Sequence, residues 1–145
     1  MHFFPLLEFS FKHKQYFMGH DVWRLPEQFI NRLGELSQGN LCTELADTVN
    51  RVQAIINSSD DHVWIITDQV MGVHSNTMAE QLLKGVKFRS LVHERLAGSS
   101  LSQVGTNVER RVLSSIPGIF AITEKEAFVE LLTMDGKLDG IGFFW

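Results

Sequence analysis

The chain has 145 residues, a hydrophobic fraction of 44%, a charged fraction of 21% and a net charge of −4 at pH 7. This length suits one domain with a sizeable core, and the composition excludes a disordered protein. The negative charge and the 13 scattered Lys and Arg residues argue against nucleic-acid binding by these residues, because phosphates require a concentrated basic face.

Residues 1–15 form an unusually aromatic segment, which contains Phe3, Phe4, Phe9 and Phe11. A cluster of this kind is rarely exposed on a monomer. We predict that it either covers the core of its own domain or serves as an interface, and that residues 16–145 form the domain proper. Glu8 interrupts the segment, which therefore does not resemble a signal peptide.

Two amphipathic helices are predicted next. The first begins at Pro26, which suits an initial helical position, and ends near Gly39. Its apolar stripe consists of Phe29, Ile30, Leu33 and Leu36. The second helix covers about residues 43–57, and its apolar stripe consists of Leu45, Val49, Val52 and Ile56. One lone cysteine, Cys42, lies just before the second helix and fits a reducing compartment.

A strand–helix–strand succession follows. Residues 63–66 are a continuous apolar run, typical of a strand buried on both faces, so Trp64 is expected in the core. Met78, Leu82 and Leu83 mark a helix that ends at Gly85, and residues 86–92 alternate as a second strand. Because a helix connects them, the two strands are predicted to be parallel.

The last third of the chain has the pattern of strands, near residues 108–114, 119–123, 128–132 and 142–145. Asp135 and Gly136 can turn the chain between the last two strands. Arg110 and Arg111 are the nearest thing to a basic cluster, but neighbours on a strand point to opposite faces. The predicted fold class is therefore α/β, a mixed sheet around a parallel βαβ unit with flanking helices.

Polar side chains follow the ends of the two parallel strands. Open α/β sheets bind ligands at this edge, so we predict a ligand-binding site there. Its residues are Asp68, Gln69, His74, His93 and Arg95. The alternative is that these side chains cap loops and helix starts.

His20 and Asp21 are a second candidate, for a ligand site or a structural role. A carboxylate can orient a histidine that titrates near neutral pH. Adjacent side chains seldom face each other, however, which favours a structural role for the pair.

Motifs for chemistry are missing from the sequence. It contains no Gly-rich nucleotide loop and no Gly-x-Ser-x-Gly elbow, and its six histidines lack metal-ligand spacing. We therefore predict no catalytic residue, no metal and no cofactor, and we expect that the chain is not an enzyme. No apolar run reaches the roughly 18 residues that span a membrane. We expect a cytoplasmic protein with no membrane partner.

Two end segments carry a family resemblance. The first holds Tyr16-Phe17, His20-Asp21 and Leu25-Pro26, and the second holds Ile116-Pro117, residues 123–127 and residues 135–139. Residues 63–69 and 84–89 also fit the pattern. In this order they resemble the middle domain of the archaeal methanogenesis regulatory protein family, from residue 16 onward.

The resemblance implies an effector-sensing domain of a winged-helix transcription regulator that acts as a homodimer. The winged helix is not among these residues, so DNA would be contacted only through that other domain. The strand–helix–strand core, with residues 84–87 leading into its second strand, also resembles the phospholipase-D-like effector domains of archaeal sugar-sensing regulators. The enzyme signature His-x-Lys is missing, since His13 is followed directly by Lys14. The alternatives are a dimerisation module without a ligand and a small α/β enzyme.

Overall fold

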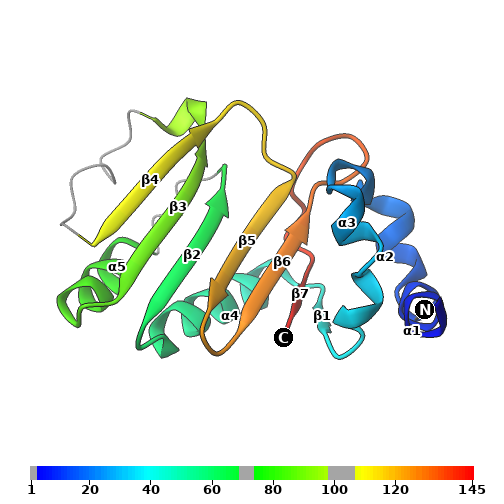
Figure 1. The fold of residues 1–145 in the computed structure, drawn as a ribbon, viewed down its shortest axis with the longest axis horizontal. Helices are drawn as coiled ribbons and strands as arrows, with labels where there is room; N and C mark the ends of the chain where they lie inside the picture. Colours follow the sequence, from blue (N-terminus) through cyan, green and yellow to red (C-terminus); the bar gives the residue numbers. More distant parts are fainter. Residues whose placement is uncertain (1–2, 69–73, 98–106) are drawn as a thin grey trace.

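Seven strands form one mixed sheet in the computed structural model, which describes residues 3–68, 74–97 and 107–145 (Figure 1). The strands are β1 (Asn40–Cys42), β2 (His62–Thr67), β3 (Lys87–His93), β4 (Val108–Leu113), β5 (Gly118–Thr123), β6 (Ala127–Leu131) and β7 (Gly142–Phe144). Their order across the sheet is β1-β7-β6-β5-β2-β3-β4. The helices are α1 (Phe3–Lys12), α2 (Lys14–Gly19), α3 (Glu27–Ile30), α4 (Leu45–Ser58) and α5 (His74–Leu83), with short 3-10 helices η1 (Val22–Arg24), η2 (Leu33–Leu36) and η3 (Glu94–Leu96). None of the described helices is both long and apolar enough to cross a membrane.

The predicted fold class is confirmed. β2, α5 and β3 form a parallel βαβ unit, and β4 continues it in parallel beside β3. β5, β6, β7 and β1 pair antiparallel on the other side of β2. Arg110 and Arg111 point to opposite faces of β4, because Arg110 lies opposite Ser90 and Arg111 opposite Leu91.

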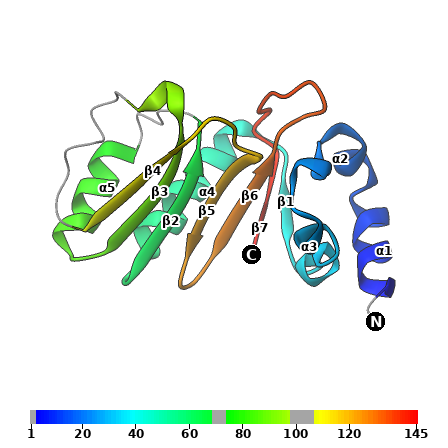
Figure 2. The same cartoon turned by 45° about the horizontal axis from the view of Figure 1, so that its top comes forward.

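Helices α4 and α5 cover one face of the sheet (Figures 1 and 2). Helix α4 buries Val52 and Ile56 of its predicted stripe together with Ile55, whereas Leu45 of that stripe is 63% exposed. The three buried side chains join a core cluster with Val63, Phe88, Ala121 and Phe128 from β2, β3, β5 and β6. Burying apolar area of this kind is the main force that holds a helix against a sheet.

The N-terminal helices pack on the opposite face, over the strands at one side of the sheet (Figure 2). Phe9 and Tyr16 are buried there in a second cluster with Leu131 of β6 and Phe143 of β7. Phe9 of the aromatic segment therefore covers its own domain, whereas Phe11 is 79% exposed, and the side chains of Phe3 and Phe4 lie outside the described part of the structure.

The prediction of one continuous helix between Pro26 and Gly39 is wrong, because the structure has two short helices in this range. α3 ends at Ile30, Arg32 departs from helical geometry with φ −105° and ψ 2°, and η2 follows as a separate 3-10 helix. Asn31 and Gly34 interrupt the stripe, and both are weak helix formers. Residues 40–42 then form a strand, β1, that the sequence pattern did not indicate.

The expectation that Trp64 belongs to the core is also wrong. Its side chain is 45% exposed, and Ile122 on the neighbouring strand is 38% exposed. The helical layer of α4 and α5 covers only one face of β2, and the N-terminal helices cover the other face only near β5, β6 and β7. β2 is therefore buried on one face, and an apolar strand sequence does not by itself distinguish these cases.

Glu124 connects the turn after α4 to the turn after β5 by hydrogen bonds. Its carboxylate accepts hydrogen bonds from the backbone N–H of Asp60 at 2.7 Å and the hydroxyl of Ser59 at 2.9 Å. Burial alone would raise its pKa, but these hydrogen bonds and that from the His62 N–H outweigh burial and lower the pKa to about 2. The ionised carboxylate is thus the form that holds the two turns together.

We expect Glu124→Gln to lower the free energy of unfolding by about 1–2 kcal/mol at neutral pH, because one charged acceptor is lost. A pKa lowered from 4.5 to about 2 stabilises the fold above pH 4.5, and this contribution is lost as the pH falls towards 2. Urea unfolding between pH 7 and pH 2 measures the difference, which should shrink in acid. Glu80→Gln, at an exposed position on α5, is the matched control. A constant difference across this pH range would contradict the assignment.

Candidate functional site

A cavity lies between the N-terminal helices and the sheet. Its volume is about 510 Å³, within the roughly 300–1,000 Å³ of small-molecule pockets. The N-terminal wall consists of Phe9, Tyr16, Phe17, Leu25, Phe29, Arg32, Leu33 and Glu35. The opposite wall consists of Ile66, Pro117, Phe120, Ile122, Val129, Leu131, Phe143 and Trp145.

The cavity wall is almost entirely aromatic and aliphatic. The charged residues in its wall are Arg32 and Glu35, which bind each other at 2.8 Å and are both well exposed at the rim. Phe29 is 52% exposed, so it lies where the cavity meets solvent. An interior of this chemistry accepts an apolar group, because a polar group would be desolvated without a hydrogen-bond partner.

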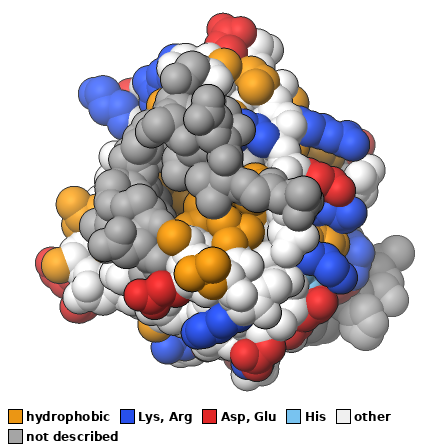
Figure 3. All heavy atoms as spheres, turned by 90° about the vertical axis from the view of Figure 1, so that its left-hand side faces the viewer, with side chains coloured by type: hydrophobic (Ala, Val, Ile, Leu, Met, Phe, Trp, Pro, Cys, Tyr) orange, Lys and Arg blue, Asp and Glu red, His pale blue; other side chains and the backbone are white. Residues whose placement is uncertain are grey.

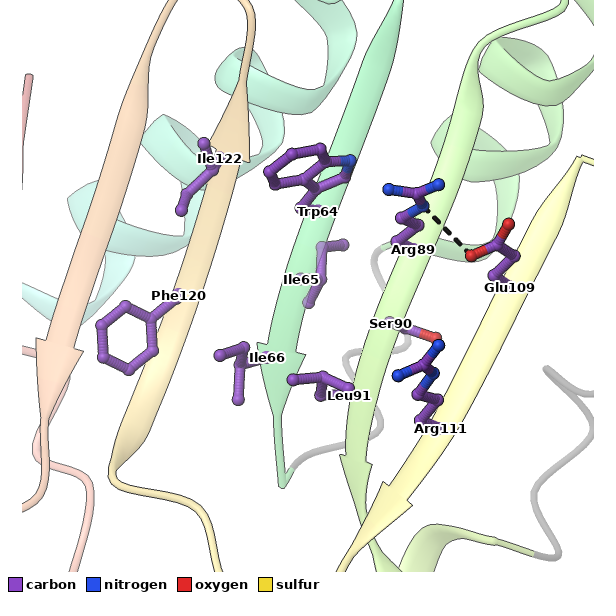
Figure 4. Close-up of a pocket in the computed structure, with 10 residues that line it drawn as sticks. All are labelled: Trp64, Ile65, Ile66, Arg89, Ser90, Leu91, Glu109, Arg111, Phe120 and Ile122. Carbon is purple, nitrogen blue, oxygen red and sulfur yellow. Dashed lines mark ion pairs between the residues drawn. The ribbon is translucent and has the colours of Figure 1, made fainter. Parts of the chain in front are cut away.

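The open part of the same sheet face continues from the cavity as a shallow groove of about 400 Å³ (Figure 4). Ile66, Phe120 and Ile122 line both hollows. Beyond them the groove runs over β2, β3 and β4, where Arg89 pairs with Glu109 at 3.1 Å. The guanidinium of Arg89 also lies 5.7 Å from the ring centre of Trp64, within cation–π range.

The predicted site at the strand ends is assembled in part. Arg95 forms an ion pair with the carboxylate of Asp68 and donates to its carbonyl oxygen at 3.1 Å. His93 accepts the Arg95 N–H at 3.2 Å through Nδ1 and thereby caps η3. Gln69 lies outside the described residues, and of His74 only the backbone, at the start of α5, is described. The described members bind and cap one another, and ligand binding there stays a prediction.

His20 and Asp21 have separate partners. The buried ring of His20 donates from Nδ1 to the carbonyl oxygen of Tyr16 at 2.7 Å, and its Nε2 lies 3.2 Å from the carboxylate of Asp139. Asp21 instead accepts the Trp23 N–H and pairs with Arg24 at 2.9 Å. The two side chains thus do not act as a pair, and both have structural partners.

Tyr16 and His20 form polar contacts that connect the N-terminal helices to the sheet. The Tyr16 ring stacks on His20 at 3.8 Å, and its hydroxyl accepts the Leu131 N–H at 3.1 Å. Buried Glu130 accepts the Gly140 N–H at 2.8 Å. Burial raises the pKa of Glu130 and of Tyr16, since both charged forms lose their hydration. The contacts of Tyr16 and His20 fix one wall of the cavity in place.

Sequence reasoning missed the cavity, because its walls come from residues 9–35, from Ile66 of β2 and from residues 117–145. The aromatic composition of the N-terminal segment was the available signal. It indicated that the segment covers something apolar, without indicating which strands.

Acidic and basic side chains alternate on the face at the β4 edge (Figure 3). Among the described side chains of this face no area of a single sign is evident, in keeping with the net charge of −4. On this face, the described side chains do not form the basic patch that a nucleic-acid backbone requires.

Comparison with solved structures identifies the fold. The archaeal chromatin protein TrmBL2, whose structure shows a novel mode of DNA binding, matches 95% of this chain with a TM-score of 0.59 and 14% identity. The chain spans 55% of the length of TrmBL2. NucT from Helicobacter pylori matches 73% of this chain and 82% of its own length, with a TM-score of 0.57 and 15% identity. Nuc from Salmonella typhimurium, a phospholipase D family member, matches 66% of this chain and 72% of its own, with a TM-score of 0.43 and 11% identity.

The likenesses to TrmBL2 and NucT show the fold alone, and they correct one prediction. The expectation that the chain is not an enzyme is contradicted, because the chain shares its fold with NucT, a member of a family of enzymes. No family model matches the sequence, and no curated protein matches it significantly. The likeness to TrmBL2 shows the fold alone, and membership of the methanogenesis regulatory family stays a prediction.

Proposed function

We propose that this chain is a regulatory domain that takes up a small effector in the cavity between its N-terminal helices and its sheet. The observation that carries the proposal is the cavity itself, with about 510 Å³ of space and an apolar wall built by two layers of the fold. A ligand there contacts both layers at once. It can therefore favour one arrangement of the N-terminal helices, by as much as its affinity differs between arrangements.

The proposal assigns DNA contact to a winged-helix domain outside these residues, in a homodimeric regulator. The fold shared with TrmBL2, a longer DNA-binding chromatin protein, supports a regulatory role. The net charge of −4 supports assigning phosphate contacts elsewhere. The N-terminal helices, which form one wall of the cavity, are the natural route for a signal to a domain preceding them.

A thermal-shift screen against intracellular metabolites tests this function. A ligand present at about 100 times its Kd adds about 2.7 kcal/mol, which raises the unfolding midpoint by several degrees. We expect a saturable shift, and we expect hydrogen exchange in α1 and α2 to slow when that ligand binds. Absence of a shift with every class of metabolite, in a folded protein, would contradict the proposal.

Two variants locate the effector. Phe29→Ala removes a half-exposed ring from the cavity wall and should weaken the shift without loss of the core. Asp68→Ala breaks the ion pair with Arg95 at the strand ends and should leave the shift unchanged. The reverse result would move the effector to the predicted site at Asp68, Gln69, His74, His93 and Arg95.

A further inference from the structure

One row of side chains crosses four strands on the open face of the sheet (Figure 4). Phe120 of β5 lies opposite Ile66 of β2, and Ile66 lies opposite Leu91 of β3. Leu91 in turn lies opposite Arg111 of β4. At a strand spacing of about 4.8 Å, the row is about 14 Å long. Apolar side chains thus lead in a straight line to a single cation.

The apolar end of this row opens into the cavity. Phe120 and Ile66 belong to the walls of both the cavity and the groove, and Ile122 joins them beside Phe120. The two hollows therefore form one continuous binding surface, which is enclosed beneath the N-terminal helices and open above β3 and β4.

Arg111 is the groove residue that can bind an anionic group of a ligand. In the neighbouring row Arg89 is neutralised by Glu109 at 3.1 Å and lies against Trp64. Arg111 is exposed at the end of the groove and forms no ion pair with any residue in the described part of the chain. Because Arg presents a planar set of donors that matches a carboxylate, the site is complementary to one anionic group.

We infer that the groove and cavity bind an amphipathic monocarboxylate, a free medium-chain fatty acid. This inference rests on the proposed function and names the class of its effector. The carboxylate binds Arg111 at the solvent-exposed end, where it keeps much of its hydration. The acyl chain lies over Leu91 and Ile66 and enters the cavity beside Phe120. A sugar fits less well, because its hydroxyl groups would lose hydration against aromatic walls without partners.

Calorimetric titration of the whole chain with octanoate, decanoate and decanol tests the inference. Affinity should rise about fourfold for each added methylene group, equivalent to about 0.8 kcal/mol. Arg111→Gln should weaken decanoate binding about tenfold and leave decanol binding unchanged, because only the acid uses the guanidinium. Lys84→Gln removes the same charge from an exposed position outside the groove and should change neither affinity.

The other outcomes overturn the inference in distinguishable ways. If Arg111→Gln and the unaltered protein bind decanoate with equal affinity, Arg111 does not bind the carboxylate and the inference is wrong. Binding of a neutral metabolite that Phe29→Ala weakens, without binding of decanoate, would refute the fatty acid and leave the proposed function standing. Sedimentation distinguishes a third outcome, in which the protein is a dimer. If decanoate leaves this dimer intact and Leu91→Gln dissociates it, the open face of the sheet binds a second copy of the chain and not a fatty acid.

Discussion

Replacing Phe143 with alanine is expected to lower the free energy of unfolding by about 3–5 kcal/mol, the usual cost of truncating a buried phenylalanine. Phe143 is 3% exposed and lies at the centre of the aromatic cluster that joins β7 to the N-terminal helices. Its ring centre lies 5.3 Å from that of Phe9, 4.9 Å from that of Tyr16 and 5.7 Å from that of Trp145. The variant therefore loses dispersion contacts with two helices as well as its own burial.

Urea unfolding measures the change, and proteolysis shows where it acts. Because Phe143 is part of the cavity wall, we expect cleavage within residues 3–19 to speed up before the sheet unfolds. Phe11→Ala is the matched control, since Phe11 is 79% exposed on α1 and its loss should cost little. Similar losses in the two variants would mean that the cluster does not hold the N-terminal helices.

Those parts of the fold were predictable that depend on the hydrophobic pattern within a single segment or on the connection between neighbouring segments. The predicted stripe of α4 placed Val52 and Ile56 correctly in the core, although it included the exposed Leu45 and omitted the buried Ile55. The alternation in residues 86–92 indicated the buried face of β3, which carries Phe88 and Val92. The parallel pairing of β2 and β3 followed from the helix between them. In each case a period along the chain and a handed connection carry the information.

The remaining elements depend on partners far away in the sequence. β1 is a strand of three residues, and its pairing with β7 joins residues about 100 positions apart. Trp64 is exposed because no described segment continues the N-terminal layer across β2, β3 and β4, a fact outside the strand's own sequence. Burial on one face or two is set by what the rest of the chain covers.

The candidate sites show the same division. Asp68, His93 and Arg95 were predicted to meet because parallel strands end at one edge, and they do meet. The groove that we propose to bind a fatty acid combines Phe120, Ile66, Leu91 and Arg111 from four strands, and only the register of all four strands aligns these residues. A fold shared with TrmBL2 and NucT does not choose between these sites, because function depends on the side chains that a fold presents.

Gly118→Ala is expected to destabilise the fold by about 3 kcal/mol, at the upper end of typical overpacking costs. A Cβ atom at Gly118 would overlap the carbonyl oxygen of Glu130 and lie 3.0 Å from the Cα of Leu131. The three atoms nearest to that Cβ atom are backbone atoms of β6, which side-chain rotation cannot move aside. β5 and β6 would have to separate at the pair formed by Gly118 and Leu131.

That separation reaches the cavity, because the Leu131 N–H also binds the hydroxyl of Tyr16 on α2 at 3.1 Å. We therefore expect Gly118→Ala to lower the unfolding midpoint and to weaken effector binding together. Gly19→Ala is the matched control, since a Cβ atom there meets nothing within 4 Å. Calorimetry of both variants provides the comparison. A Gly118→Ala protein as stable as Gly19→Ala would mean that β6 can shift freely, and the wall that Leu131 and Tyr16 build would then not be rigid.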